Sequence, residues 1–230
     1  MRCGSGPAKP TPTPCSRRRH FRIGPAADRP DPVEILIEQG KSRIPELLPI
    51  RYGRMRTDPF AFLRGAAAVM AADLASTPTT DIRMQACGDA HLNNFGSYAT
   101  PDGLPVFDIN DFDETLPAPF EWDLKRLATS LVVAGRVADY SAKAARGLAL
   151  GMTRSYREHM TALARLPPVE AWNRHIDLAR AIAHIDEPKV RAMVEKHLAQ
   201  VLESGSQHFD LVEKRTGRST SARSRRWCTI

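Results

Sequence analysis

The segment that most constrains this chain runs from Met84 to Asp123 and combines short apolar runs with many polar side chains. It reads MQACGDAHLNNFGSYATPDGLPVFDINDFDETLPAPFEWD, so carboxylates, carboxamides and an imidazole stand between regular elements. A solvated loop needs no apolar runs, whereas a metal or phosphate site needs oxygen ligands that are held in place. The functional site is therefore expected in this segment.

The net charge of +7 is confined to the two ends of the sequence. Residues 1–30 and 214–230 each carry a net charge of +6, which leaves −5 for residues 31–213. Because the basic residues lie in the tails, we expect no nucleic-acid partner for the body of the protein. An acidic body that handles an anionic substrate needs metal cations between the two.

Composition predicts one domain over residues 31–213, between two tails. Residues 1–30 are rich in Pro, Gly, Ser and Arg and have no apolar period, so we expect a disordered basic arm. Residues 214–230 also lack a period and are expected to be a disordered basic tail or a truncation scar. The cysteines have no paired spacing, and no apolar run approaches the roughly 20 residues of a membrane span. These features favour a cytoplasmic protein without a membrane partner.

Apolar periodicity predicts a mainly helical domain. Asp31 and Asp58 each precede a proline, which is typical of a helix N-cap and first helical position, and Gly40 and Pro78 end the two helices. Between them, Pro45 and Pro49 indicate a packed connection. Further helices are predicted after Pro119, with an apolar face at Leu124, Leu127, Ala128, Leu131 and Val132, and over about 141–164, 168–184 and 188–213.

Two short runs, Ile82–Cys87 and Pro105–Ile109, predict a β-hairpin that brings the acidic clusters together. The Pro101-Asp102-Gly103 sequence between them is typical of a turn. The expected fold class is therefore mainly α with a small β-hairpin, an α+β protein.

The residue types of this hairpin predict a site for metal-assisted phosphate chemistry. Asp89 and Asn94 lie five positions apart across a tight turn, so both can face one pocket, and Asp111 can complete a magnesium site of oxygen ligands. Such a site holds a polyphosphate through the cation while Asp89 accepts a proton from the attacking hydroxyl.

Three motifs in this segment resemble those of aminoglycoside phosphotransferases, choline kinases and related small-molecule kinases. Gly88–Asn94 resembles their G-D-x-H-x-x-N catalytic loop, Ile109–Glu114 their I-D-[FW]-[DE] metal motif, and Trp122-Asp123-Leu124 their later D-L-A. The resemblance implies the fold of the helical C-terminal lobe of a protein-kinase-like protein. It also implies Mg²⁺ and ATP as cofactors and a small-molecule substrate whose identity the sequence does not give.

Residue by residue, the resemblance implies a base, metal ligands and supporting residues. Asp89 is the catalytic base, Asn94 and Asp111 bind Mg²⁺, Asp123 is a buried brace for the catalytic loop, and His91 is a structural member of that loop. Asp113 is a further candidate ligand, and Asp108 competes with Asp111, which is favoured by its Phe-Asp successor and its distance to Asp123. One departure is Cys87, where these kinases have a histidine.

Longer blocks of residues 31–165 resemble a bacterial family of unknown function, the DUF family numbered 2252. These blocks are RYGRM, DPFAFLRGAA, CGDAHLNNFG, FDINDFDET and PFEWDLKRLA. The resemblance implies a longer kinase-like protein whose glycine-rich turn and nucleotide-binding lysine follow the catalytic loop. This chain has no G-x-G-x-x-G segment, which favours a truncated chain whose exposed apolar surface leads to self-association.

Two alternatives to a phosphotransferase remain at the sequence level. The G-D-x-H pattern followed by Asp and Asn also occurs in metal-dependent phosphoesterases, which need further His ligands. The absence of a glycine-rich loop and its lysine also agrees with a non-catalytic remnant or a binding module.

Overall fold

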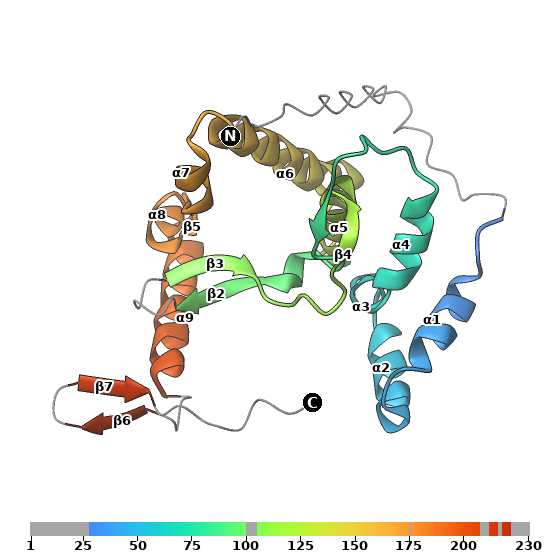
Figure 1. Cartoon of the computed structure of the whole chain (residues 1–230), viewed down its shortest axis with the longest axis horizontal. Helices are drawn as coiled ribbons and strands as arrows, with labels where there is room; N and C mark the ends of the chain where they lie inside the picture. The colour runs from blue at the N-terminus through green and yellow to red at the C-terminus, as the bar shows by residue number, and fades with distance from the viewer. Residues whose placement is uncertain (1–27, 100–104, 175, 208–211, 216–217, 222–230) are drawn as a thin grey trace, which may run out of the picture. The chain divides into compact units, whose positions relative to one another are not determined.

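The computed structural model describes residues 28–99, 105–174, 176–207, 212–215 and 218–221, and the chain forms two compact units (Figure 1). The first unit is built from the chain up to Asn94 together with Ile109–Pro167, and the second from Phe95–Asp108 together with the chain from Pro168 on. Helices dominate the described residues and the sheets are small and antiparallel. The predicted fold class, mainly α with a small β component, is confirmed.

The first unit begins with α1 (Pro32–Gly40), a 3₁₀ turn η2 (Pro45–Leu47) and α2 (Leu48–Met55). Helix α1 starts as predicted, since the Asp31 side chain accepts a hydrogen bond from Val33 N at 2.7 Å. The packed connection predicted around Pro45 and Pro49 is wrong. Both prolines lie in the first turn of a helical element, where the N–H group that proline lacks has no partner to lose.

Helices α3 (Pro59–Gly65) and α4 (Ala67–Ala75) replace the single helix predicted from Asp58 to Pro78. Asp58 caps α3 as predicted, accepting from Phe60 N and Ala61 N at 2.8 Å each. The break follows from side chains that occupy the last carbonyl groups of α3. Arg126 donates to Leu63 O and Arg51 donates to Gly65 O, each at 2.6 Å, where a continuing helix would place its own N–H groups.

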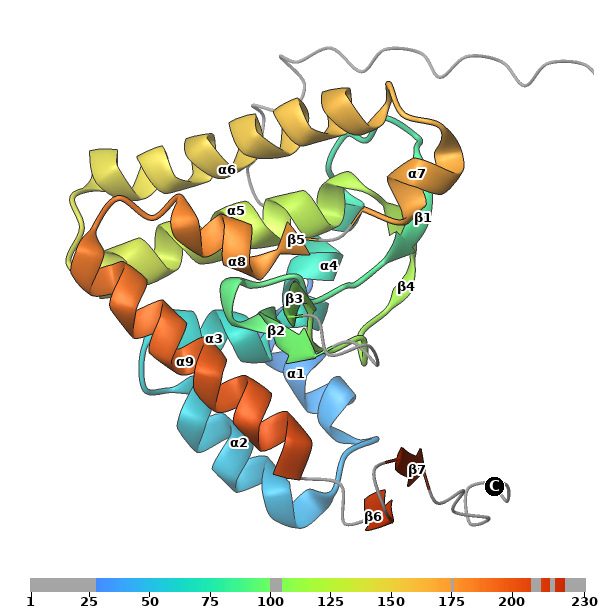
Figure 2. The same ribbon diagram turned by 90° about the vertical axis from the view of Figure 1, so that its left-hand side faces the viewer.

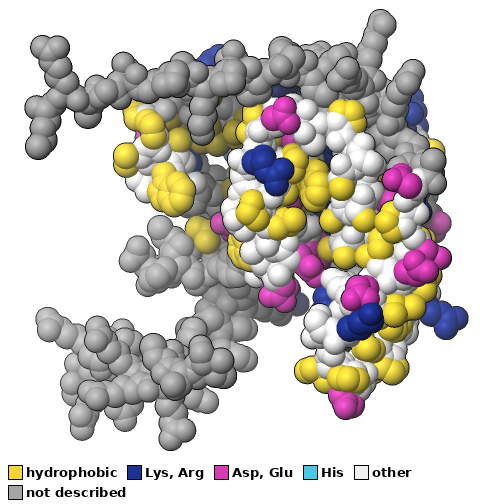
Figure 3. Space-filling view, turned by 45° about the vertical axis from the view of Figure 1, so that its right-hand side comes forward, with side chains coloured by type: hydrophobic (Ala, Val, Ile, Leu, Met, Phe, Trp, Pro, Cys, Tyr) yellow, Lys and Arg dark blue, Asp and Glu magenta, His cyan; other side chains and the backbone are white. Residues whose placement is uncertain are grey.

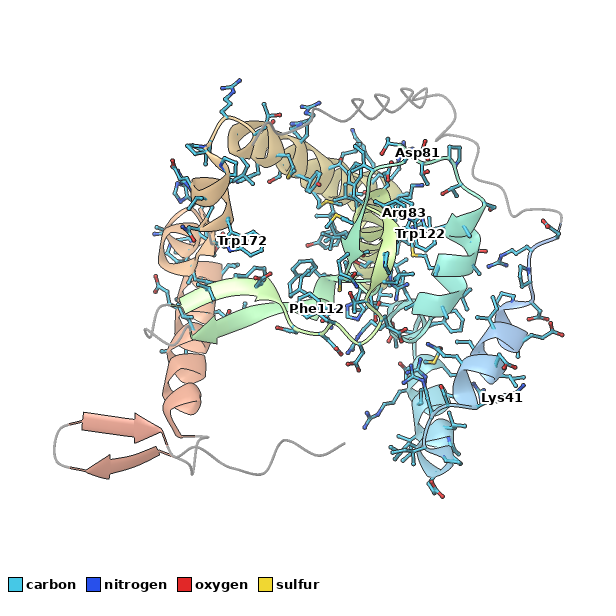
Figure 4. The ribbon with its side chains drawn as sticks, in the orientation of Figure 1. Lys41, Asp81, Arg83, Phe112, Trp122 and Trp172 are labelled. Atoms are coloured by element: carbon cyan, nitrogen blue, oxygen red, sulfur yellow. The ribbon has the colours of Figure 1, made fainter. Side chains whose placement is uncertain are left out.

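The first unit has one two-stranded sheet, in which β1 (Arg83–Ala86) pairs antiparallel with β4 (Leu116–Pro119). Arg83 also donates from its side chain to Pro117 O at 2.6 Å, and it is labelled on β1 in Figure 4. The predicted pairing of this run with Pro105–Ile109 is wrong. That segment is β3 of the second unit, because Phe95–Ala99 forms a strand of its own, β2, which is the neighbour of β3 in the sheet.

Helices α5 (Glu121–Val137) and α6 (Ala142–Leu163) run side by side and complete the first unit (Figure 2). Their close approach depends on small residues, since a Cβ added to Gly135 would lie 3.3 Å from the Cβ of the fully buried Ala145. Helix α5 also packs on α3 and α4. Helix α5 therefore links helices α3, α4 and α6 to the loop that carries the predicted catalytic residues.

The second unit holds a sheet of order β2-β3-β5 and the helices α7 (Pro168–Trp172), α8 (Leu178–Ala183) and α9 (Pro188–Gln207). The helix predicted over 168–184 is interrupted by β5 (Ile176–Asp177), which pairs with β3, whereas α9 agrees with the helix predicted from 188. Helix α9 packs on β2. Among the described residues, no helix has the length and apolar character needed to cross a membrane.

Parts of the predicted tails and turns lie outside the described residues, namely residues 1–27, the turn at 101–103 and residues 222–230. At the start of the predicted C-terminal tail, β6 (Val212–Arg215) and β7 (Arg218–Ser221) form a hairpin instead of an aperiodic segment. The predicted end of the preceding helix at residue 213 is therefore wrong, because residues 212 and 213 belong to β6. The domain limits themselves stay a prediction.

Exposed apolar side chains gather on the N-terminal helices of the first unit. Val33 and Ile37 on α1 and Leu47 and Ile50 around α2 are each more than half exposed. Figure 3 shows this face, with hydrophobic side chains in yellow beside acidic and basic ones. Self-association through such a surface stays a prediction.

Candidate functional site

One cavity of about 850 Å³ lies in the first unit, between the predicted catalytic loop, the predicted metal motif and helices α2 and α3. Its volume is in the usual range for small-molecule sites. The lining includes acidic and basic side chains in equal number. The acidic ones are Asp89, Asp111, Asp113 and Glu114, and the basic ones are Arg43, Arg51, Arg54 and Arg64.

The loop of residues 87–94 depends on Gly88 for its shape and on Asp123 for its position. Gly88 has a positive φ of 82°, and a Cβ at this position would lie 2.0 Å from the backbone oxygen of Glu114, so only glycine fits. Asp123, in the first turn of α5, accepts hydrogen bonds from Cys87 N at 2.8 Å and Gly88 N at 3.0 Å. The part-buried carboxylate of Asp123 thus holds the start of the loop at two points.

Asp89 is held by a buried arginine that the sequence reasoning missed. Arg126 on α5 is 2% exposed, and its Nε and Nη2 atoms donate to Asp89 Oδ1 at 2.9 and 2.5 Å. None of the motifs in the sequence assigns a role to Arg126. A signal was present, because Arg126 follows Asp123 by three residues and side chains at this spacing share a helix face.

His91 lies on the other side of the Asp89 carboxylate. Its Nε2 is 3.6 Å from Asp89 Oδ2, and its ring packs edge-on against Phe60. Burial lowers the pKa of His91, so the imidazole is neutral at pH 7 and the contact with Asp89 is not an ion pair. The ring atom Nδ1 is buried and has no hydrogen-bond partner within the described parts of the chain.

Asn94 joins the two predicted motifs. Its Nδ2 donates to the backbone oxygens of Asp89 and Asp111, each at 3.0 Å, so the carboxamide ties the loop of residues 87–94 to that of residues 110–114. The Cys87 thiol donates to the same Asp111 oxygen at 3.4 Å, and burial raises the pKa of this thiol, which keeps its proton in place. Asn94 is buried, and it ends the 3₁₀ turn η3 (Leu92–Asn94).

The carboxylate of Asp111 is exposed to the cavity, and its Oδ1 accepts a hydrogen bond from Asp113 N at 3.1 Å. Asp113 lines the same cavity and is also exposed, as is Phe112 between them (Figure 4). Asp108 is an exposed residue on β3 and belongs to the second unit. The structure thus brings Asp89, His91, Asn94, Asp111 and Asp113 to one cavity, with Asp123 behind the loop.

The donor atoms around this cavity suit a hard cation. Asp111 offers a carboxylate, and Asn94, whose nitrogen is engaged with the backbone, has only its carboxamide oxygen to offer. Across the described residues, no three His, Cys, Asp or Glu side chains gather as a complete metal-binding group. Mg²⁺ retains several waters and takes oxygens from a bound phosphate, so one or two protein ligands are an ordinary share. The residues present therefore fit Mg²⁺ in a shared site.

Fold and site together define a mainly helical α+β protein with one cavity lined by both acidic and basic side chains. A family model described as "Uncharacterized protein conserved in bacteria (DUF2252)" matches residues 43–227, and the chain belongs to this family. No curated protein matches the chain. No solved structure matches it either.

Proposed function

We propose that this cavity is the phosphoryl-transfer site of a kinase-like phosphotransferase, which moves a phosphate from ATP to a small molecule with the help of Mg²⁺. The observation that supports the proposal is the presence of Asp89, Asn94 and Asp111 in one cavity, in the chain order of the kinase motifs. We also propose, as part of the same hypothesis, that the fold is related to the helical C-terminal lobe of kinases.

In this mechanism Asp89 accepts the proton of the attacking hydroxyl. Its Oδ1 is occupied by Arg126, so Oδ2 is the oxygen that takes the proton. Arg126 and Asp123 position the loop, and neutral His91 adds no charge that would compete for the carboxylate. Asp111 and Asn94 would hold Mg²⁺, which neutralises phosphate charge when bound.

A binding function without catalysis is the second candidate, and the ion pair between Asp89 and Arg126 favours it. The two hydrogen bonds from the buried guanidinium occupy Oδ1 of Asp89, so this oxygen holds the loop and is not available to a substrate hydroxyl. In that case the cavity binds the nucleotide and does not turn it over. A two-metal phosphoesterase gains no comparable observation, because its further ligands are not found near Asp89 in the described residues.

The test is Mg²⁺-dependent ATP binding and turnover by the full chain, measured by calorimetry and by release of ADP. We expect Asp111→Ala to abolish the gain in ATP affinity that Mg²⁺ produces, and Asp186→Ala, an exposed residue of the second unit, to leave it unchanged. A Mg²⁺-dependent gain in affinity that survives Asp111→Ala would overturn the metal assignment.

Asp89→Asn separates the two candidates. In a phosphotransferase this variant binds ATP and loses turnover at least a hundredfold, because general-base catalysis contributes about that much. In a binding module neither the parent nor the variant turns ATP over. Hydrolysis of phosphoesters with Mn²⁺ and without nucleotide would support the phosphoesterase instead.

A further inference from the structure

Three arginines on α2 and α3 face the same cavity as the acidic residues. Arg51 and Arg54 are three positions apart on α2, so they share a helix face, and Arg64 lies near the end of α3. Arg43, which precedes η2, completes the basic side of the lining. These four residues belong to the first unit, as does every residue that lines the cavity.

The charges of this basic side are only partly balanced. Arg43 pairs with Glu114 at 3.2 Å, while its Nε is buried without a hydrogen-bond partner among the described residues. Arg51 donates to a carbonyl oxygen, Gly65 O, and not to a carboxylate. Burial, and next the nearby charge of Arg43, lower the pKa of Arg51. Two guanidinium groups thus stand close together in a place that favours an added anion.

The guanidinium groups of Arg54 and Arg64 form no hydrogen bond or ion pair with any other described residue; the hydrogen bond from Thr57 Oγ1 goes to the backbone oxygen of Arg54. On the acidic side, Asp89 is already neutralised by Arg126, and Glu114 by Arg43. The remaining cavity charges are the cations Arg51, Arg54 and Arg64 against the anions Asp111 and Asp113. The basic side therefore holds more unpaired charge than the acidic side can balance.

We propose that Arg51, Arg54 and Arg64 form a phosphate-binding wall, and that the ligand is an oligophosphate whose phosphates lie between this wall and Asp111. This inference rests on the proposed function and names the residues that neutralise the negative charge of the transferred phosphate. Guanidinium groups bind phosphate oxygens through two parallel hydrogen bonds, which suits a ligand with several charged oxygens. The sequence contains no G-x-G-x-x-G segment, and the wall supplies the neutralisation that such a loop and its lysine provide elsewhere.

The test measures binding of tripolyphosphate and of ATP to the full chain by calorimetry, with EDTA and with Mg²⁺. We expect the double variant Arg54→Gln/Arg64→Gln to weaken binding of both ligands at least tenfold in both conditions, since each hydrogen bond to a charged group contributes measurably. Both residues are exposed, so the variant folds; an unchanged melting temperature without ligand verifies this. The matched control is Arg154→Gln, an exposed arginine on α6 that does not line the cavity.

Asp111→Asn makes the test independent of the proposed reaction. Without metal, this change removes a negative charge that faces the phosphates, so binding should stay equal or become tighter. With Mg²⁺, it removes a ligand of the cation, so binding should weaken. Opposite effects in the two conditions would show that the arginine wall and the metal site at Asp111 bind the phosphates separately.

The outcomes are distinct. If the two ligands bind with equal affinity, the natural ligand is a free oligophosphate. If ATP binds at least tenfold more tightly than tripolyphosphate, the natural ligand is a nucleotide. Both results support the phosphate-binding wall. No oligophosphate binding in either condition would overturn the proposal. So would affinities that the double variant leaves unchanged, or that Arg154→Gln weakens equally. Oligophosphate binding without any phosphoryl transfer would contradict the proposed function but would still support the phosphate-binding wall.

Discussion

The two loops that carry the motif residues differ in how the protein holds them. In the loop of residues 87–94 the side chains themselves are fixed, since Asp89 accepts two hydrogen bonds from Arg126, and Asn94 donates to two backbone oxygens. In the loop of residues 110–114, the backbone oxygen of Asp111 is fixed from outside, while its carboxylate bonds only within its own loop among the described contacts.

This difference separates residues that build the site from residues that are available to a ligand. The rigid loop is stabilised by α5, so changes there should cost folding free energy as well as function. The carboxylate of Asp111 contributes little to folding, so it can turn toward a cation at small cost. Stability measurements on single variants can test this contrast. We expect the largest losses for variants that affect the loop of residues 87–94 and the smallest for Asp111 in the loop of residues 110–114.

The largest loss of stability is expected for Arg126→Met. The change leaves the Asp89 carboxylate without its cation in a mostly buried position, which should lower the free energy of unfolding by about 3 kcal/mol. Urea denaturation measures it, with Arg136→Met, exposed on the same helix, as the control near zero. The double variant Asp89→Asn/Arg126→Met should recover part of the loss. If Arg126→Met left the free energy of unfolding unchanged, the ion pair would not be what holds the loop.

Gly88→Ala should cost about 2 kcal/mol, because the new Cβ meets Glu114 O and the backbone has a positive φ. The matched control is Gly151→Ala on α6, where a Cβ meets no atom within 4 Å. That substitution should raise the free energy of unfolding by about 0.5 kcal/mol, since alanine favours a helix. Equal effects of the two variants in urea would contradict the shape assigned to the loop.

His91 should make stability depend on pH, by at most about 1.4 kcal/mol per pH unit. Its pKa in the folded state is lowered below the usual 6.5, so the unfolded chain binds the proton first as the pH falls. The free energy of unfolding should be fully present above pH 6.5 and decrease below it, until the folded protein is protonated too. His91→Gln should flatten this part of the profile; a slope that persists in the variant would assign it to other groups.

Asp111→Ala should have the smallest effect on stability, within about 0.5 kcal/mol, because the side chain is exposed and bonds only to its own loop. Thermal and urea unfolding of the variant without ligand measure this. A loss as large as that of Gly88→Ala would remove the distinction between the two loops.

The residues of the candidate site could be grouped from the sequence more precisely than the fold around them could be predicted. Asp89, Asn94 and Asp111 could be grouped because short motifs in a fixed order are legible in a single chain. Arg126 could not be assigned, because an arginine on a helix is ordinarily a surface residue, and only its placement against α3 and the loop makes it a buried partner. The arginines of the cavity were not grouped either, since their common direction arises from how α2 packs on α3.

The fold class and the capped helices could be predicted from local rules, as Asp31 and Asp58 show. Strand pairing could not, because runs of four or five residues carry no information about their partner. Ala86 therefore pairs with Leu116, and Phe107 with Ile176 of a distant segment. The break at Ala66 also depends on long-range hydrogen bonds from Arg51 and Arg126, which no local pattern encodes.

The two backbone N–H groups that bond to Asp123 have a kinetic consequence. Cys87 and Gly88 acquire their hydrogen bonds only when a helix that begins some 35 residues later has docked. Their exchange with deuterium should therefore report the docking of α5 and not the formation of β1. During synthesis, the loop of residues 87–94 cannot reach its final shape until the first turns of α5 have left the ribosome.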